Sequence, residues 1–318
     1  MIKLSKNIVK EIKRAQSIAI FTHTSPDFDA LGSSLTVCEM AKAMGKNAVV
    51  FVKDKLSENQ SMLFGKDCFS NEDCDFASYD LLISTDCPSL DRLGSYAKGF
   101  EKHQNTFVID HHKSGGLVGK FNLLCPNYSS CCEIIFEILK VLKVKISPQM
   151  ASYLYAGLSS DTNSFINLNV TQASFDNASK LLALGADCNS VNEKLYKNKT
   201  KKEVEFKKYL WSNFKIEKDV AYCVMDNQTL TKMKGQKYNC SNFSSELLSI
   251  QGVNYSFSIV EEKKGYFNLS LRSKMGYAVL PVAQSFGGGG HLYAAGAQFK
   301  ENSINDALTK VLKILRKK

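Results

Sequence analysis

The sequence predicts an α/β fold whose N-terminal part is a doubly wound, mainly parallel sheet. Short apolar runs rich in β-branched and aromatic residues alternate with helical patterns between residues 17 and 184, as in repeated β-α-β units. After residue 210 the order changes to runs typical of antiparallel strands, followed by one amphipathic helix. We therefore expect a smaller C-terminal α+β domain, with an active site in the cleft between the two domains.

The elements of the N-terminal domain follow from the spacing of its apolar residues. Four apolar runs predict strands at residues 17–23, 47–53, 80–85 and 106–109. Apolar residues at helical spacing predict helices at 1–16, 30–44, 130–142, 148–159 and 171–184. Gly45 and Gly185 are suited to end two of these helices. Helices between successive strands are what a doubly wound sheet requires.

A charged segment separates the two expected domains. Residues 191–210 are dense in lysine and glutamate and keep helical propensity, so we expect an exposed helical linker between domains at 1–190 and 211–318. The C-terminal domain is expected to contain strands at 221–225, 255–261 and 266–272. A helical stretch at 278–286 leads into a glycine run, and a final helix is expected at 304–315.

Composition and charge limit the classes of protein to which the chain can belong. It is 44% hydrophobic and 23% charged, as globular proteins are, and no apolar run approaches the about 18 residues of a membrane span. The N-terminal segment lacks a signal-peptide core, so we expect a cytoplasmic protein with no membrane partner and with its ten cysteines reduced. A formal net charge of +10 favours a polyanionic partner. A homodimer is compatible with the sequence, but no feature requires one.

Acids and histidines follow the expected strands at the points where those strands end. Ligands of parallel α/β sheets bind at the carboxyl ends of the strands. We therefore predict that these side chains converge on one metal centre. The candidates are His23, Asp27 and Asp29 after the first strand, Asp86 after the third, Asp110, His111 and His112 after the fourth, and Asp161 after a helix.

The loop after the first strand contains three candidate ligands, His23, Asp27 and Asp29. In an extended chain the two carboxylates point the same way, and they repel each other unless a cation neutralises them. One imidazole with carboxylate oxygens suits Mn²⁺ or Mg²⁺, and the lack of thiolates is unlike a zinc finger. The alternative is that Asp27 or Asp29 only caps the following helix.

The remaining candidates suggest a division of tasks. Asp86 could bridge two metals, since each carboxylate oxygen can bind one ion. For Asp86 and Asp161 the alternative is a turn or capping role. Neighbouring residues of an extended chain face opposite ways, so one of His111 and His112 could bind metal while the other faces the substrate. Asp110 could fix a ring tautomer.

Cations and glycines are candidates for substrate binding. Arg92 could reach a phosphate or pair with Asp91. Four consecutive glycines at 287–290 cannot form a helix interior, but their N–H groups could surround an anion as a nest. The alternative for this run is a flexible linker. The expected substrate-binding residues are Arg92, Arg272, Gly288, Gly289, Gly290 and His291.

The order of these motifs resembles that of the DHH phosphoesterases. The chain contains H-x-x-x-D-x-D-A-x-G-S at 23–33, a strand ending in Asp86, D-H-H at 110–112 and G-x-x-x-D-T-x-x-F at 157–165. LSLRS at 269–273 and FGGGGHLYAAGA at 286–297 resemble the DHH-associated C-terminal domain. The compact two-domain length most resembles the NrnA-type branch of oligoribonucleases and 3′-phosphoadenosine-5′-phosphate (pAp) phosphatases.

The resemblance implies two divalent cations, Mn²⁺ by preference and Mg²⁺ as the alternative. It implies that His23, Asp27 and Asp86 bind the first cation, and that Asp29, Asp86, His111 and Asp161 bind the second, with Asp86 bridging. His112 would contact the scissile phosphate, so the expected catalytic residues are Asp86, Asp110 and His112. Phe28 and Asn163 stand where the family usually has glycine, and Phe28 could narrow or reshape the entrance.

The resemblance also implies the reaction. The expected substrates are short RNA oligonucleotides, hydrolysed to mononucleotides, and pAp, which loses its 3′-phosphate. One alternative is hydrolysis of cyclic or linear dinucleotides such as c-di-AMP and pApA, and another is a RecJ-like single-strand exonuclease. A nucleic-acid-binding protein with a vestigial metal site is a further alternative. Such a protein would lack at least one metal ligand, and none is missing from this sequence. A dedicated pyrophosphatase is disfavoured by the glycine-rich tail.

Overall fold

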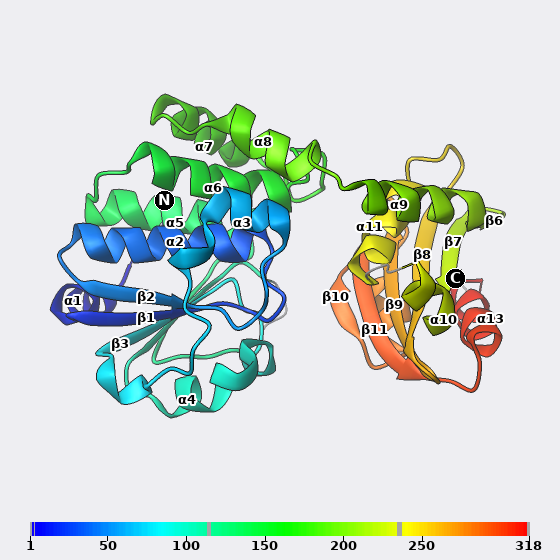
Figure 1. Ribbon diagram of the computed structural model, residues 1–318, viewed down its shortest axis with the longest axis horizontal. Helices are drawn as coiled ribbons and strands as arrows, with labels where there is room; N and C mark the ends of the chain where they lie inside the picture. Colours follow the sequence, from blue (N-terminus) through cyan, green and yellow to red (C-terminus); the bar gives the residue numbers. More distant parts are fainter. Residues whose placement is uncertain (1, 3, 113–115, 234–236, 317–318) are drawn as a thin grey trace. The chain divides into compact units, whose positions relative to one another are not determined.

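The chain divides between Asn198 and Lys199 into two units, each built on its own sheet. The computed structural model describes residues 2, 4–112, 116–233 and 237–316 (Figure 1). No helix among these residues is long and apolar enough to cross a bilayer. The predicted combination of a doubly wound parallel sheet and a second, smaller α+β domain is confirmed.

The first unit contains a five-stranded parallel sheet in the order β2-β1-β3-β4-β5. The order reverses at β1, so the chain winds outward in both directions from β1 and β3, and ligands of such sheets bind at this switch point. The fifth strand was not predicted from the sequence. The strands are β1 (Ser17–Phe21), β2 (Asn47–Phe51), β3 (Leu81–Thr85), β4 (Thr106–Asp110) and β5 (Phe121–Leu124).

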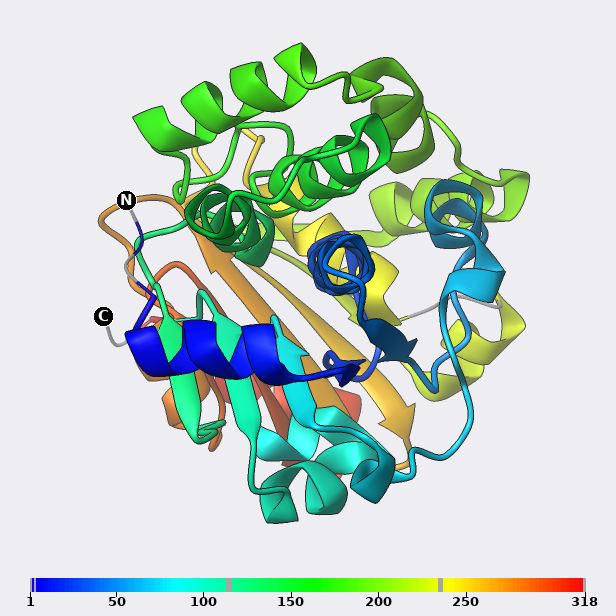
Figure 2. The same ribbon diagram turned by 90° about the vertical axis from the view of Figure 1, so that its left-hand side faces the viewer.

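Helices cover both faces of this sheet. One face packs against α2 (Phe28–Ala43) and α5 (Cys131–Leu142), with α6 (Pro148–Asp161) packed on these two helices. The other face packs against a 3₁₀ segment (Leu90–Tyr96) and α4 (Ala97–Lys102). The helix α2 is buried all round because it lies between the sheet and α6 (Figures 1 and 2). The other helices are α1 (Lys6–Arg14), α3 (Glu58–Phe64), α7 (Gln172–Ala183) and α8 (Cys188–Tyr196), and two short 3₁₀ turns lie at Lys66–Cys68 and Phe76–Ser78.

The second unit contains a six-stranded sheet in the order β10-β11-β9-β8-β7-β6. Its strands are antiparallel except for β7 and β8, which are parallel. They are β6 (Lys215–Glu217), β7 (Val220–Met225), β8 (Tyr255–Lys263), β9 (Tyr266–Ser273), β10 (Gly289–His291) and β11 (Ala294–Lys300). One apolar core lies under α12 (Leu280–Gln284) and α13 (Ile304–Leu315), and another under α9 (Lys201–Asn213) and α11 (Lys237–Leu247). The short α10 (Asn227–Lys232) packs beside β8.

The segment expected to form one exposed linker is divided between the two units. The helix α8 ends at Tyr196 in the first unit, and α9 begins at Lys201 in the second. Phe206 and Leu210 of α9 are buried in the core of the second unit. The lysines and glutamates of this stretch therefore lie on the outer face of a packed helix, which is why composition alone suggested a linker.

Candidate metal centre

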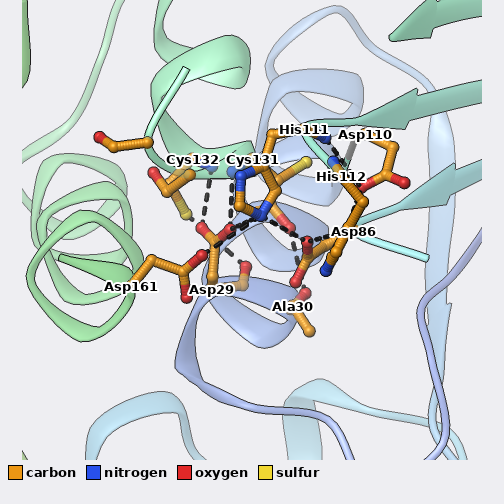
Figure 3. Close-up of polar contacts among 12 residues, drawn as sticks. Asp29, Ala30, Asp86, Asp110, His111, His112, Cys131, Cys132 and Asp161 are labelled. Atoms are coloured by element: carbon orange, nitrogen blue, oxygen red, sulfur yellow. Dashed lines mark hydrogen bonds and ion pairs between the residues drawn. The ribbon is translucent and has the colours of Figure 1, made fainter. Parts of the chain in front are cut away.

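The predicted acids and histidines meet at the carboxyl ends of β1, β3 and β4. His23 lies two residues after β1, Asp86 directly follows β3, and Asp110 is the last residue of β4. Asp161, the last residue of α6, approaches from the helical layer. Figure 3 shows Asp29, Asp86 and Asp161 directed toward His111. The switch point of the sheet thus holds the cluster, as the strand order leads one to expect.

Three overlapping groups of side chains have ligand atoms within 4.8 Å of one another among the described residues. Two groups combine one imidazole nitrogen with two carboxylate oxygens, and the third combines two imidazole nitrogens with one carboxylate oxygen. Mixed nitrogen and oxygen donors of this kind suit Mn²⁺ or Mg²⁺. Asp86 belongs to two of the groups, and His111 also belongs to two. The groups are His23 with Asp27 and Asp86, Asp29 with His111 and Asp161, and Asp86 with His111 and His112.

Asp86 lies at the middle of the cluster. Its Oδ2 is 3.7 Å from His23 Nε2, and its Oδ1 is 3.4 Å from His111 Nε2. The residue is 1% exposed, its φ is +52°, and Oδ1 accepts no hydrogen bond from the described residues. Burial, and then the charge of Asp29, raises the pKa of this carboxyl well above its usual value. A buried carboxylate held in this way fits a site built for cations, because a cation would restore its charged form.

Asp29 is held by the N-terminus of α5. Cys131 N–H donates to its Oδ2 at 2.6 Å, and Cys132 N–H donates to its Oδ1 at 2.9 Å (Figure 3). The positive end of the helix dipole faces the carboxylate, which favours its charged form. Burial nevertheless raises the pKa of Asp29. Sequence reasoning missed this contact, since backbone N–H groups carry no signal in residue identity.

Asp27 has the capping role that the sequence left as one alternative, in a geometry that is compatible with the other, metal binding. Its Oδ1 caps α2 by accepting the N–H groups of Asp29 and Ala30, each at 3.0 Å. Its Oδ2 lies 3.9 Å from His23 Nε2. Capping uses one oxygen and leaves the other directed toward the cluster, so the two roles are compatible.

The two adjacent histidines have different partners. His111 Nε2 lies 3.2 Å from Asp161 Oδ2, whereas His112 Nδ1 lies 2.7 Å from Asp110 Oδ1. Asp110 also accepts the backbone N–H groups of both histidines. Burial alone would raise the pKa of Asp110, but the hydrogen bonds and charge of His112 outweigh it and lower that pKa.

Protonation in the cluster shows how strongly its charges interact. Burial raises the pKa of Asp161 to about 7, and the charge of Asp29 adds to this effect. Burial would lower the pKa of His111, but the Asp161 and Asp86 carboxylates outweigh it and raise that pKa well above its ordinary value. Without a cation, Asp29, Asp86 and Asp161 therefore lose their protons less readily than free carboxyl groups do.

The two departures from the family pattern are explained by the backbone and the core. The Phe28 ring packs 5.9 Å from the ring of Phe64 and joins the apolar core. The α3 helix provides an apolar surface for this ring, and an effect of Phe28 on the width or shape of the entrance stays a prediction. Asn163 has φ +47°, in the left-handed region that favours glycine and that asparagine tolerates.

Arg92 lies at the edge of the cluster and beside a candidate ligand. Its Nη2 is 2.9 Å from His23 Nδ1, and its backbone carbonyl accepts the Thr24 N–H at 2.7 Å. His23 Nδ1 is also 2.9 Å from the Thr24 carbonyl. The structure thus places the Arg92 guanidinium beside Nδ1 of His23. The sequence had suggested a phosphate or Asp91 as the partner of Arg92, and not His23.

The substrate-binding candidates of the second unit share one level of its sheet. Arg272 of β9 and His291 of β10 both pair with Ala294 of β11, so their side chains start from the same face, two strands apart. Arg272 Nε donates to Ser245 Oγ at 3.2 Å, and Nη1 donates to the Leu271 carbonyl at 2.9 Å. Burial lowers the pKa of this guanidinium.

The glycine run forms a turn and an edge strand instead of the expected nest. Gly287 and Gly288 N–H donate to carbonyls of α12, and Gly289 begins β10. A Cβ on Gly288 would lie 2.1 Å from the Gly296 carbonyl oxygen, and one on Gly290 would lie 2.7 Å from that of Ala294. Close packing of β10 on β11 therefore explains why glycine is needed at both positions.

Comparison with known proteins agrees with this architecture. The family model described as "DHH family, N-terminal domain" matches residues 17–158, and the "DHHA1 domain" model matches residues 220–317. The bifunctional oligoribonuclease and PAP phosphatase NrnA of Mycoplasma genitalium is 29% identical, and the alignment covers 96% of each chain. The probable enzyme of the same name from Streptococcus mutans is 28% identical over 98% of this chain and 99% of that one.

A solved structure has the same fold over almost the whole length. The crystal structure of an exopolyphosphatase-related protein from Bacteroides fragilis matches with a TM-score of 0.89 and 25% sequence identity, covering 99% of this chain and 98% of that chain. The two domain models together cover most of the sequence, and every candidate metal ligand except Asp161 lies within the first of them. The chain therefore belongs to the DHH family of phosphoesterases, with an N-terminal DHH domain and a C-terminal DHHA1 domain.

Proposed function

We propose that the protein hydrolyses short oligoribonucleotides to mononucleotides and removes the 3′-phosphate of pAp, using two divalent cations, Mn²⁺ by preference. The observation that carries this proposal is the position of Asp86 between two ligand groups. Asp86 groups with His23 and Asp27, and its Oδ1 lies 3.4 Å from Nε2 of His111, which groups with Asp29 and Asp161. Two relatives that align over nearly the full chain carry names that describe both activities. The donor set of imidazoles and carboxylates supports the choice of cation.

The ligand groups suggest how two cations would be held. His23, Asp27 and Asp86 would hold the first, and the second would be held by Asp29, Asp86, His111 and Asp161. The pKa values of Asp29, Asp86 and Asp161 are all raised in their crowded surroundings, so positive charge is what this site lacks. Bound divalent cations supply Lewis-acid charge and lower the pKa of water at a phosphate ester.

His112 is the proposed contact to the scissile phosphate. Its hydrogen bond to Asp110 holds the ring by Nδ1, which fixes both orientation and tautomer. Burial would lower the pKa of His112, but the hydrogen bond and the charges of Asp110 and Asp86 outweigh it and raise that pKa. The raised pKa favours the cationic form of the ring, which stabilises negative charge that develops on phosphate oxygens.

The second unit is proposed to bind the nucleotide phosphates. It contains 20 lysines and arginines against 10 acids in residues 199–318, whereas residues 1–198 contain 21 of each. The whole excess of +10 therefore belongs to the DHHA1-containing unit, as expected for a domain that binds polyanions. Arg272 and His291 would supply donors, with the glycine run at 288–290 allowing close approach, and Arg92 would contribute from the first unit.

A panel of substrates tests this proposal. Purified protein with Mn²⁺ would be given RNA di- to pentanucleotides, pAp, pApA, c-di-AMP, pyrophosphate and long single-stranded DNA in parallel. Turnover of short RNA and pAp above that of all other substrates would support it. Preference for pApA or c-di-AMP would shift the assignment to dinucleotides, and hydrolysis of long DNA alone would shift it to a RecJ-like exonuclease. Either result would reject the substrate assignment.

A further inference from the structure

The last residues of the first unit contact structures on two sides of the metal centre. Tyr196 ends α8, and Asn198 is the last residue before the second unit begins. We call residues 196–198 the boundary segment. The helix α8 packs against both α6 and α3 at the edge of the first unit (Figure 1). The helix α6 ends at Asp161, and α3 contacts the loop that carries Asp27, so each helix is connected to a different proposed cation ligand.

Tyr196 is joined to the turn that carries Asp161. Its hydroxyl donates to the Ser159 carbonyl at 2.6 Å and lies 3.0 Å from Ser159 Oγ. The same carbonyl accepts the Ser164 N–H at 2.7 Å. Ser159 is fully buried and precedes Asp161 by two residues, while Ser164 follows it by three. One carbonyl thus links the Tyr196 hydroxyl to the chain on both sides of Asp161.

Asn198 is joined to the loop that carries Asp27. Asn59 Nδ2 of α3 donates to the Asn198 carbonyl at 3.0 Å, and Asn198 Nδ2 donates to Asn59 Oδ1 at 2.7 Å. The next residue of α3, Gln60, donates through Nε2 to the Pro26 carbonyl at 2.7 Å. Pro26 directly precedes Asp27. The short helix α3 therefore connects the boundary segment to this ligand loop.

The ligands that these contacts support are the less buried ones. The Asp27 side chain is 51% exposed and that of Asp161 is 19% exposed, against 0% for Asp29 and 2% for Asp86. Core packing and the α5 N-terminus hold the two buried acids. The two outer acids lie at an exposed loop and a helix end, so their positions depend on hydrogen bonds to neighbouring elements.

We propose that Tyr196, Asn198 and Gln60 are positioning residues that hold Asp161 and Asp27 where they can bind cations. The inference rests on the proposed two-cation centre. By thermodynamic reciprocity, a contact that strengthens cation binding is itself strengthened when the cation binds. Cation binding therefore orders residues 196–198, which directly precede the start of the second unit at Lys199.

Cation affinity of single variants tests the first half of the proposal. Tyr196→Phe removes one hydroxyl, and Asn198→Ala and Gln60→Ala remove the α3 connection. Titration with Mn²⁺ by calorimetry should show affinity for one of two cations weakened about tenfold in each variant. Double-mutant cycles should show coupling between Gln60→Ala and Asn198→Ala but not between Gln60→Ala and Tyr196→Phe. The control is Lys194→Ala, whose ammonium contacts Ser190 on the same helix.

Hydrogen exchange tests the second half. Adding Mn²⁺ to the wild-type protein should slow amide exchange at residues 196–200, and Tyr196→Phe combined with Asn198→Ala should abolish that slowing. The inference would be overturned if all three single variants bound both Mn²⁺ ions with wild-type affinity, or if amide exchange at residues 196–200 did not respond to Mn²⁺. Neither result would affect the proposed function. A wild-type protein that binds no Mn²⁺ would overturn both.

Discussion

Asp86→Asn is expected to cause the largest loss of activity of any single substitution in the centre. Asparagine keeps the size of the side chain but has no charge and only one oxygen. Asp86 faces His23 with one oxygen and His111 with the other, so the substitution weakens both proposed cation sites. A charge-assisted contact contributes about 1.5–3 kcal/mol, and losing one at each site removes about 3–6 kcal/mol, equivalent to a rate loss of about 10²- to 10⁴-fold.

The assay for this prediction is phosphate release from pAp under saturating Mn²⁺, with Mn²⁺ content measured by plasma mass spectrometry on the same samples. Circular dichroism checks that the variant is folded. Asp91→Asn, which changes an exposed acid five residues away, is the matched control and should keep wild-type turnover. Turnover of Asp86→Asn within about tenfold of the wild type, with two Mn²⁺ retained, would refute the bridging role of Asp86.

Four further predictions follow from the same geometry. Metal-free protein should lose thermal stability as pH rises from about 4 through 7. Burial raises the pKa of Asp161 to about 7, so in this pH range the folded state binds a proton that the unfolded chain releases. Asp161→Asn should flatten this part of the plot of melting temperature against pH. His112→Ala should lower kcat by about 10²-fold and leave Mn²⁺ content unchanged, and a loss of metal would instead make His112 a ligand. Gly157→Ala places a Cβ 2.4 Å from Asp29 Oδ1, so calorimetry should show lower stability by about 1–3 kcal/mol and weaker Mn²⁺ binding. Arg272→Lys loses the planar fork, so KM for pAp should rise by about tenfold with Mn²⁺ affinity unchanged, and an unaltered KM would remove Arg272 from the substrate site.

The parts of the fold that the sequence predicts are those with a strong local pattern. The strands β1, β3 and β4 each contain an apolar run that is buried on both faces, and each leads directly to acids or histidines. Those polar residues at the ends of apolar runs were sufficient to predict that they would converge. The helices α5 and α6 were also predicted, because their apolar segments are longer than those of strands.

The elements that were missed lack such a pattern. The edge strand β5 has four residues of alternating burial, which is too short a signal to distinguish from a loop. The helix α11 is largely polar in sequence, and its position depends on packing against β7, β8 and β9. In these elements tertiary contacts decide the structure, and such contacts leave little trace in local composition.

Within the site, side-chain identity could be predicted but support by the backbone could not. The acids and histidines could be identified from residue type alone. The groups of Cys131 and Cys132 that hold Asp29 are backbone N–H groups, which do not depend on residue type. The contact of the Phe28 ring with Phe64 could not be predicted for a related reason, because Phe64 is distant in sequence. The glycine run was interpreted as a nest because the short strand β10 and its close packing on β11 were not predicted from the sequence.

The most direct test of the two-cation centre is anomalous diffraction from crystals grown with Mn²⁺ and measured at the manganese absorption edge. Two peaks are predicted, about 3.5–4 Å apart, with Asp86 between them. One should lie beside His23 and Asp27, and the other beside His111 and Asp161. A single peak, or two peaks of which neither touches Asp86, would contradict the account.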